Sequence, residues 1–140
     1  MTLHFCKIEI FKISGHNGHF IFQVAGWGRI SEETTNTTLS SVLRKVHAPI
    51  IPINECKRIY PKYRIITNDK QICAGAINGQ DSCTGDSGGP LIVSKSESTD
   101  STKYLYGIVS FGSRKCGNGK PAVHTNLRYY KDWILKNLRP

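Results

Sequence analysis

A serine flanked on both sides by glycines marks the part of the chain most able to do chemistry. The ten residues 81–90 read DSCTGDSGGP, and Ser87 lies within them. Glycines let the backbone turn sharply and bring successive N–H groups towards one point, where they can stabilise an oxyanion. Gly85 and Ser87 are the expected donors of those N–H groups. The pattern predicts acyl transfer with Ser87 as nucleophile, in preference to a glycine-rich turn with an incidental serine.

The other chemistry-bearing side chains do not form a metal-binding pattern. The five cysteines, at positions 6, 56, 73, 83 and 116, include no C-x-x-C pair and no short Cys/His pairing of the kind that zinc sites use. His16 and His19 are close in sequence but have no two further ligands at suitable spacing, so a glycine-rich loop is the preferred interpretation. We expect neither a metal nor another cofactor.

The net charge is strongly positive, at +9 for 140 residues. Such a charge makes contact with a polyanion worth considering. The basic residues are scattered along the chain except for one dense cluster, which consists of Lys57, Arg58, Lys62 and Arg64. A solvated basic face is the preferred interpretation of this cluster, and a polyanion-binding site stays open as the alternative.

The composition indicates one folded domain. With 39% hydrophobic and 21% charged residues, the chain is too apolar to be wholly disordered. No apolar run approaches the ~18 residues needed to cross a bilayer, so no membrane contact is expected. Because Lys7, Glu9 and Lys12 interrupt the apolar residues that follow Met1, we expect these residues not to act as a secretory signal.

Short strands separated by turn residues must position the Ser87 segment. Alternation over Phe20–Trp27 predicts a first strand, which ends at the turn signals Gly26 and Gly28. Residues 42–53 predict an edge or bulged strand because they contain two prolines. The further predicted strands are residues 71–76, 90–94, 104–111 and 122–125. The polar segments 31–41 and 94–103 are expected to be surface loops, and the first carries a glycosylation sequon at Asn36.

The chain is expected to end in a short amphipathic helix. Leu127, Tyr130, Ile134 and Leu138 recur at helical spacing, with Trp133 expected near the apolar face. Several short strands followed by one helix predict an all-β fold, an antiparallel Greek-key barrel with a short C-terminal α-helix.

The segment around Ser87 resembles the active-site sequence of the trypsin/chymotrypsin-like serine proteases. The resemblance extends over roughly residues 24–138 and covers only the C-terminal half of that family's domain, its second barrel. The supporting motifs are VAGWG at 24–28, CAG at 73–75, GIVSFG at 107–112, KPAVHT at 120–125 and YYKDWI at 129–134. Several segments look most like the arthropod proteases of clotting and immune cascades. Residues 1–20 do not match the family, so residues 21–140 are interpreted as the barrel half of a peptidase domain.

The resemblance implies a role for each matched residue. Ser87 would be the nucleophile, and the backbone N–H groups of Gly85 and Ser87 would form the oxyanion hole. Asp81 would lie at the base of the primary specificity pocket and select Arg or Lys in the substrate. The other implied substrate-binding residues are Ser82, Thr84, Ser110, Phe111, Gly112 and Ala122.

Within that set, two groups of residues have more specific implied roles. Ser110, Phe111 and Gly112 would pair with the substrate backbone. Ala122 stands where the family usually has glycine, so its methyl should narrow the pocket.

The resemblance also implies disulfides and an ion pair. The framework pairs Cys56 with Cys73 and Cys83 with Cys116, and it leaves Cys6 unpaired. Asp86 matches the aspartate that binds the N-terminal ammonium created when the family's zymogens are cleaved. That N-terminus belongs to the other barrel, so Asp86 is expected to lack its partner and its loop to be loose.

Function follows from what the matched half contains. The family's histidine base and orienting aspartate lie in the first barrel, and the segment that carries the base is absent from this sequence. His124 stands where tyrosine is common and is interpreted as a packed structural histidine.

We therefore predict a serine endopeptidase of trypsin-like specificity. It would be extracellular and act on proteins or peptides with Arg or Lys, present as an incomplete chain that is inactive alone. A non-catalytic binding or regulatory protein, and a second chain that supplies the missing barrel, are the open alternatives.

Overall fold

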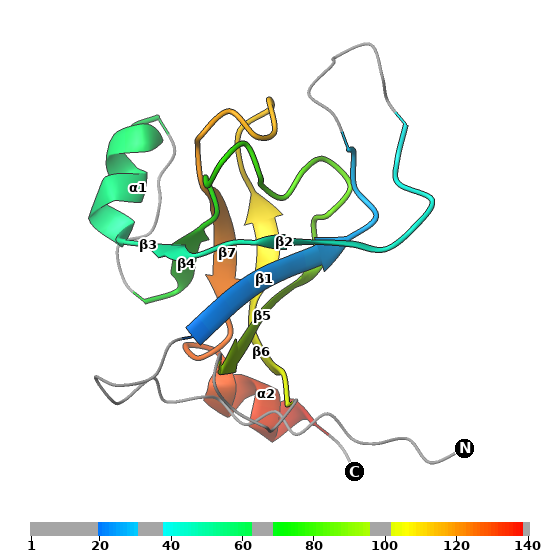
Figure 1. Cartoon of the computed structure of the whole chain (residues 1–140). Helices are drawn as coiled ribbons and strands as arrows, with labels where there is room; N and C mark the ends of the chain where they lie inside the picture. The colour runs from blue at the N-terminus through cyan, green and yellow to red at the C-terminus, as the bar shows by residue number, and fades with distance from the viewer. Residues whose placement is uncertain (1–19, 31–37, 63–68, 96–101, 139–140) are drawn as a thin grey trace.

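The computed structural model describes residues 20–30, 38–62, 69–95 and 102–138 (Figure 1). They form seven strands: β1 Phe20–Gly26, β2 Arg44–His47, β3 Ile50–Ile51, β4 Gln71–Ala74, β5 Pro90–Lys95, β6 Tyr104–Phe111 and β7 Ala122–Asn126. Two short helices are present, α1 Ile53–Ile59 and α2 Lys131–Asn137. Each predicted strand is found, and the proline-containing segment 42–53 is divided into β2 and β3.

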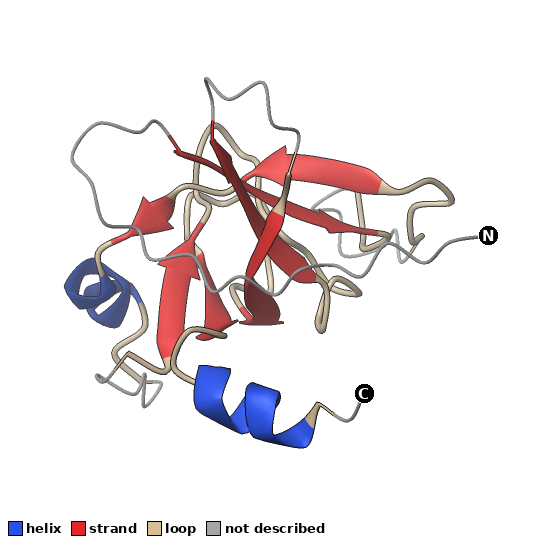
Figure 2. Cartoon of the chain, turned by 90° about the horizontal axis from the view of Figure 1, so that it is seen from below, coloured by secondary structure: helices blue, strands red, loops and turns tan. Residues whose placement is uncertain are grey.

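The strands close into an antiparallel barrel. Their order in the sheet is β2-β1-β5-β6-β7-β4-β3, so the two edge strands are consecutive parts of one segment. The residues between these parts join both edges, because Ala48 N–H donates to the Phe22 carbonyl and the Pro49 carbonyl accepts from Gly75 N–H. This closure removes free sheet edges and confirms the predicted all-β barrel (Figures 1 and 2).

Two apolar clusters stabilise the barrel. Residues whose side chains share the inner face of the sheet form the first, namely Val24, Ala48, Ile72, Ala74, Leu91 and Val109. Cys73 points to the opposite face, since successive side chains of a strand alternate, and it forms the second cluster with Cys56, Tyr60 and Val123. This second cluster fixes α1 against β4 and β7.

Both disulfides implied by the resemblance are present, Cys56–Cys73 and Cys83–Cys116. The first joins α1 to β4. The second joins the segment before Ser87 to the segment after β6. Cys6 and the sequon residue Asn36 lie outside the described residues.

The prediction misses helix α1, since it extends a strand to Ile53 and places no helix after it. Ile53, Cys56 and Ile59 recur at every third residue, which is a helical signal, and Pro52 suits the position before a first turn. Lys57 and Arg58 of the basic cluster lie on α1. Lys62 is exposed just beyond it, and Arg64 is not among the described residues.

Helix α2 is present where it was expected, but its orientation differs from the prediction. Trp133 is 67% exposed, whereas the prediction places it near the apolar face. Neighbouring residues of a helix are rotated by about 100°, so Trp133 turns outward while the adjacent Ile134 is half-buried. Neither described helix has the length or apolar composition to span a membrane.

A histidine lies inside the barrel. His124 is 1% exposed and pairs across the sheet with Ile72 and Val109. Neither ring nitrogen has a hydrogen-bond partner in the described part of the chain. Burial lowers the pKa of His124 from its usual 6.5 to about 4, opposed in part by nearby backbone groups of Ala122 and Ile72, so the ring is neutral at pH 7. A buried ring without a hydrogen bond of good geometry still destabilises the fold, by roughly 1–3 kcal/mol.

We expect His124→Leu, a change of similar volume, to raise the free energy of unfolding at pH 7 by roughly 1–3 kcal/mol. The contribution of His124 to stability, taken as the difference between the natural chain and the leucine variant, should fall by about 3 kcal/mol from pH 6.5 to pH 4, because over this range the unfolded histidine binds a proton that the folded one does not. The leucine variant lacks this contribution. Urea unfolding at several pH values measures both effects, with His47→Gln as the exposed-histidine control. The same pH dependence in natural and leucine chains would contradict the assignment.

Candidate active site

Ser87 lies on a tight loop between the second disulfide and β5. Gly85 and Gly88 have φ of 101° and 83°, which side-chain-bearing residues rarely adopt. Two turns shape the loop, since Asp86 N–H donates to the Cys83 carbonyl and Gly89 N–H donates to the Asp86 carbonyl. The Ser87 side chain is exposed at the outside of this loop, where a substrate can reach it.

The loop is fixed to the end of β6. Gly88 N–H donates to the Val109 carbonyl at 2.9 Å, and the Ser87 hydroxyl donates to the Ser110 carbonyl at 3.5 Å. The N–H groups of Gly85 and Ser87 donate no hydrogen bond to any other described residue. Both are therefore open to an acceptor supplied by a ligand.

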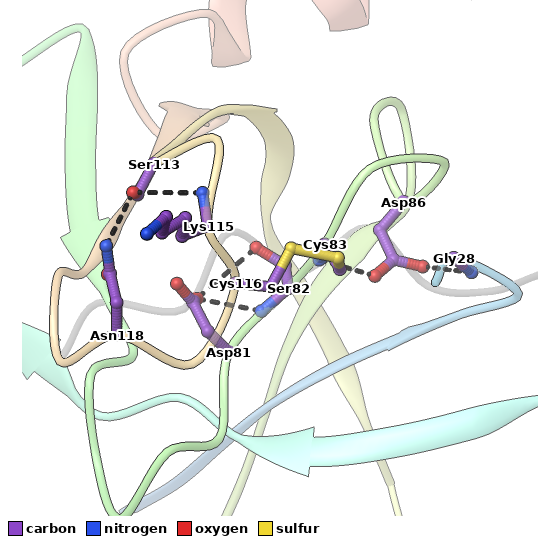
Figure 3. Close-up of a disulfide and its surroundings, with 9 residues drawn as sticks. All are labelled: Gly28, Asp81, Ser82, Cys83, Asp86, Ser113, Lys115, Cys116 and Asn118. Carbon is purple, nitrogen blue, oxygen red and sulfur yellow. Dashed lines mark hydrogen bonds between the residues drawn. A yellow bond between two sulfur atoms is a disulfide. The ribbon is translucent and has the colours of Figure 1, made fainter. Parts of the chain in front are cut away.

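The Asp86 carboxylate holds this loop against β1. Its Oδ1 accepts from Gly28 N–H at 2.7 Å and its Oδ2 from Cys83 N–H at 2.8 Å (Figure 3). A Cβ at Gly28 would lie 2.6 Å from the carboxylate atoms, and one at Gly26 would overlap Oδ1. Backbone donors therefore bind both carboxylate oxygens, while the expectation that Asp86 lacks an ammonium partner stays a prediction.

Sequence reasoning missed the role of Gly26 and Gly28 in seating the Asp86 carboxylate. It read them only as turn signals at the end of a strand. Their place in the VAGWG motif was the available signal.

A cavity of about 290 Å³ lies beside the Asp86 carboxylate. One wall consists of β1 and β2 residues, including Val24, Arg44 and Lys45, and the other includes Asp81 and Asp86. The cavity thus gives access to both carboxylates from the β1–β2 side of the molecule.

Asp81 is the second half-buried carboxylate of the site. Ser82 N–H donates to its Oδ1 at 2.7 Å, and the Ser82 hydroxyl lies 3.5 Å from the same atom. Burial raises the pKa of Asp81 from 3.8 to about 7, partly opposed by these hydrogen bonds. At neutral pH the carboxyl is thus poised between charged and neutral forms, and a cation beside it would favour the charged form.

Glycines and Ala122 surround Asp81 at one end of the barrel. A Cβ at Gly75 would lie 2.8 Å from the Asp81 Oδ1 and 3.9 Å from the Ala122 nitrogen. A Cβ at Gly112 would lie 3.4 Å from the Ala122 methyl. Asp81 and Ala122 thus both lie close to Gly75, and the Ala122 methyl lies beside Gly112.

The structure brings most of the predicted site residues together. The Cys83–Cys116 disulfide joins the Asp81–Ser87 segment to the segment that follows β6. Thr84 is exposed, and its carbonyl accepts from Arg29 N–H at 3.0 Å. Ser110 is exposed, and its carbonyl lies beside the Ser87 hydroxyl. Phe111 packs against Tyr60 of the second cluster.

No histidine–carboxylate pair contacts Ser87 within the described residues. The two histidines described are His124, which is buried in the barrel, and His47, which is exposed on β2. The described part of the chain also holds no group of three residues able to bind a metal ion. The site as described consists of an exposed serine, open N–H donors and a half-buried carboxylate.

Known proteins match this arrangement. The family model described as Trypsin matches residues 17–134. Melanization protease 1 of Drosophila melanogaster is 41% identical over 130 residues, which are 90% of this chain and 32% of that protein. CLIP domain-containing serine protease B4 of Anopheles gambiae is 42% identical over 115 residues, 81% of this chain and 30% of that protein. The chain thus spans about a third of these relatives' length.

A solved protease structure also matches the fold of this chain. Neuropsin, a serine protease of mouse brain, superposes with a TM-score of 0.69 at 35% identity, covering 87% of this chain and 49% of that one. Family match, relatives and fold agree with the loop geometry around Ser87. The chain belongs to the trypsin family of serine proteases.

Proposed function

We propose that residues 21–140 are the C-terminal barrel half of a serine endopeptidase that cleaves after Arg or Lys. The observation that carries this proposal is the half-buried Asp81 carboxyl, which the Cys83–Cys116 disulfide and the Ser87 loop hold close to an exposed serine. A buried carboxylate is costly without a counter-charge, and a basic substrate side chain supplies one.

In this proposal each predicted residue has one task. The Ser87 hydroxyl attacks the substrate carbonyl carbon, and the N–H groups of Gly85 and Ser87 stabilise the resulting oxyanion. The substrate backbone pairs with Ser110–Gly112, next to the serine. Asp81 binds the guanidinium or ammonium group, with Ser82, Thr84 and Ala122 around it.

The base and its orienting carboxylate would come from outside these 140 residues, either from another part of a longer protein or from a second chain. A serine hydroxyl without an adjacent base is a weak nucleophile, so the chain alone should be inactive. In the longer protein, Asp86 would also form an ion pair with the N-terminal ammonium created by zymogen cleavage. The cavity beside Asp86 supports this ion pair, because an ammonium group that enters the cavity would add a charge contact to the two backbone hydrogen bonds of the carboxylate.

We also propose an extracellular location. The two disulfides fit an oxidising compartment, where such bonds form and persist. The arthropod relatives named as melanization and CLIP-domain proteases support the same assignment.

The isolated chain is expected to hydrolyse Arg and Lys amide substrates no faster than its Ser87→Ala variant, because no base is placed beside the serine. Release of a fluorescent amine over hours measures this rate. Faster turnover by the natural chain that disappears in Ser87→Ala would show that the 140 residues are catalytically sufficient.

Benzamidine, an amidinium probe of the Arg pocket, should bind more tightly as the pH rises from 5 to 8. The charged form of Asp81 binds the cation, and with a pKa of about 7 this form is lost by up to tenfold per pH unit below that value. At pH 7 binding should release a fraction of a proton, which calorimetry in buffers of different ionisation heat detects. Asp81→Asn should abolish the pH dependence, and an unchanged pH profile in that variant would contradict the role of Asp81.

Ala122→Gly should strengthen binding of benzylamine more than binding of benzamidine. A compact ammonium cannot span the space that the Ala122 methyl occupies, whereas a planar amidinium has several donors and longer reach. We expect the benzamidine-to-benzylamine affinity ratio to fall by about tenfold in the glycine variant, equal to about 1.4 kcal/mol. Ala48→Gly, a buried alanine of the inner cluster, is the control. An equal ratio in Ala122→Gly and the natural chain would place Ala122 outside the pocket.

A further inference from the structure

We propose that a basic loop, residues Ser113–Lys120, selects substrates with acidic side chains at the third to fifth positions before the cleaved bond. The inference rests on the proposed function, because it takes the substrate backbone to pair with Ser110–Gly112. It adds to that function a substrate class, acidic peptides that end in Arg or Lys.

The first argument is the position of the loop. It begins two residues after β6 ends at Phe111, and the Ser110 carbonyl at the end of that strand accepts from the Ser87 hydroxyl. The Cys83–Cys116 disulfide joins the middle of the loop to the segment just before Ser87 (Figure 3). The basic loop therefore lies at the rim of the candidate active site.

The second argument is the order of the loop. The Ser113 hydroxyl oxygen accepts from Asn118 Nδ2 at 2.7 Å and from Lys115 N–H at 3.3 Å (Figure 3). Lys120 N–H donates to Asn118 Oδ1 at 3.2 Å, which closes the other side of the turn. A disulfide and three hydrogen bonds hold the loop in one conformation, so little conformational entropy is lost when a ligand binds.

The third argument is charge. Arg114, Lys115 and Lys120 are all exposed, and the loop contains no acidic residue. In the described part of the structure none of the three forms an ion pair, and the carboxyl of Asp81 is engaged by Ser82. The rim thus presents unpaired cations beside a pocket that requires a cation from the substrate.

The direction of the substrate connects these arguments. An antiparallel peptide with its basic residue beside Ser110 runs along Gly112 towards the basic loop, at roughly 3.3 Å per residue. Its third residue before the cleaved bond then lies near Gly112, and the fourth and fifth lie along Ser113–Lys115. Carboxylates at these positions would face Arg114 and Lys115, whereas basic side chains there would be repelled.

Two fluorescein-labelled pentapeptide amides test the proposal on the 140-residue chain, Glu-Glu-Glu-Gly-Arg and Gln-Gln-Gln-Gly-Arg. Fluorescence anisotropy at low salt gives the two dissociation constants without any need for catalysis. We expect the glutamate peptide to bind about tenfold more tightly, since exposed ion pairs contribute a few-fold each, and this preference to shrink at high salt.

Paired variants separate the loop from the overall charge. Arg114→Gln/Lys115→Gln should reduce the preference to about twofold or less, because it removes the two nearest cations. Lys62→Gln/Lys131→Gln removes the same charge from exposed lysines elsewhere and should keep the preference. Equal affinity for both peptides, equal loss in both double variants, or no measurable binding of the glutamate peptide would overturn the proposal.

Asp81→Asn distinguishes failure of the loop proposal from failure of the proposed function. If the pocket assignment holds, this variant weakens both peptides alike and leaves their ratio unchanged. If Asp81→Asn weakens neither peptide, the pocket assignment fails, and the ratio still reports on the basic loop alone.

Discussion

The geometry of the site depends on the position of one carboxylate, that of Asp86. Asp86 accepts hydrogen bonds from Gly28, two residues after β1, and from Cys83 in its own loop, so it joins the barrel wall to the Ser87 segment. Only glycine at positions 26 and 28 lets the carboxylate approach this closely. Together with the hydrogen bonds of the loop to β6 and the Cys83–Cys116 disulfide, this attachment leaves Ser87 exposed at the outside of the loop.

Burial shifts the pKa values of Asp81 and His124 in opposite directions. Burial raises the pKa of Asp81 to about 7, so its contribution to stability is present below pH 3.8 and is lost as the pH rises through 7. Burial lowers the pKa of His124 to about 4, so its contribution is present above pH 6.5 and is lost as the pH falls through 4. The two effects oppose each other between these values. The contributions of Asp81 and His124 to the pH dependence of folding therefore largely cancel over this range.

Charge is divided between the inside and the rim of the site. Inside, Asp81 and Asp86 are half-buried and hydrogen-bonded to backbone N–H groups. At the rim, Arg114, Lys115 and Lys120 are exposed on a cross-linked turn. This separation favours a ligand with a cationic end and an anionic body over one of uniform charge, since each part then meets a complementary field.

The sequence by itself determined the strands, the barrel class and, through the family resemblance, both disulfides. These features follow from local alternation, turn residues and a specific motif, and all of these can be read along the chain. Only the tertiary structure decided that Asp86 has backbone partners, that α1 covers β4, that Trp133 faces outward and that His124 is unpaired in the core. Each depends on contacts between residues distant in sequence, such as Gly28 and Asp86, and a local pattern does not encode which distant groups will meet.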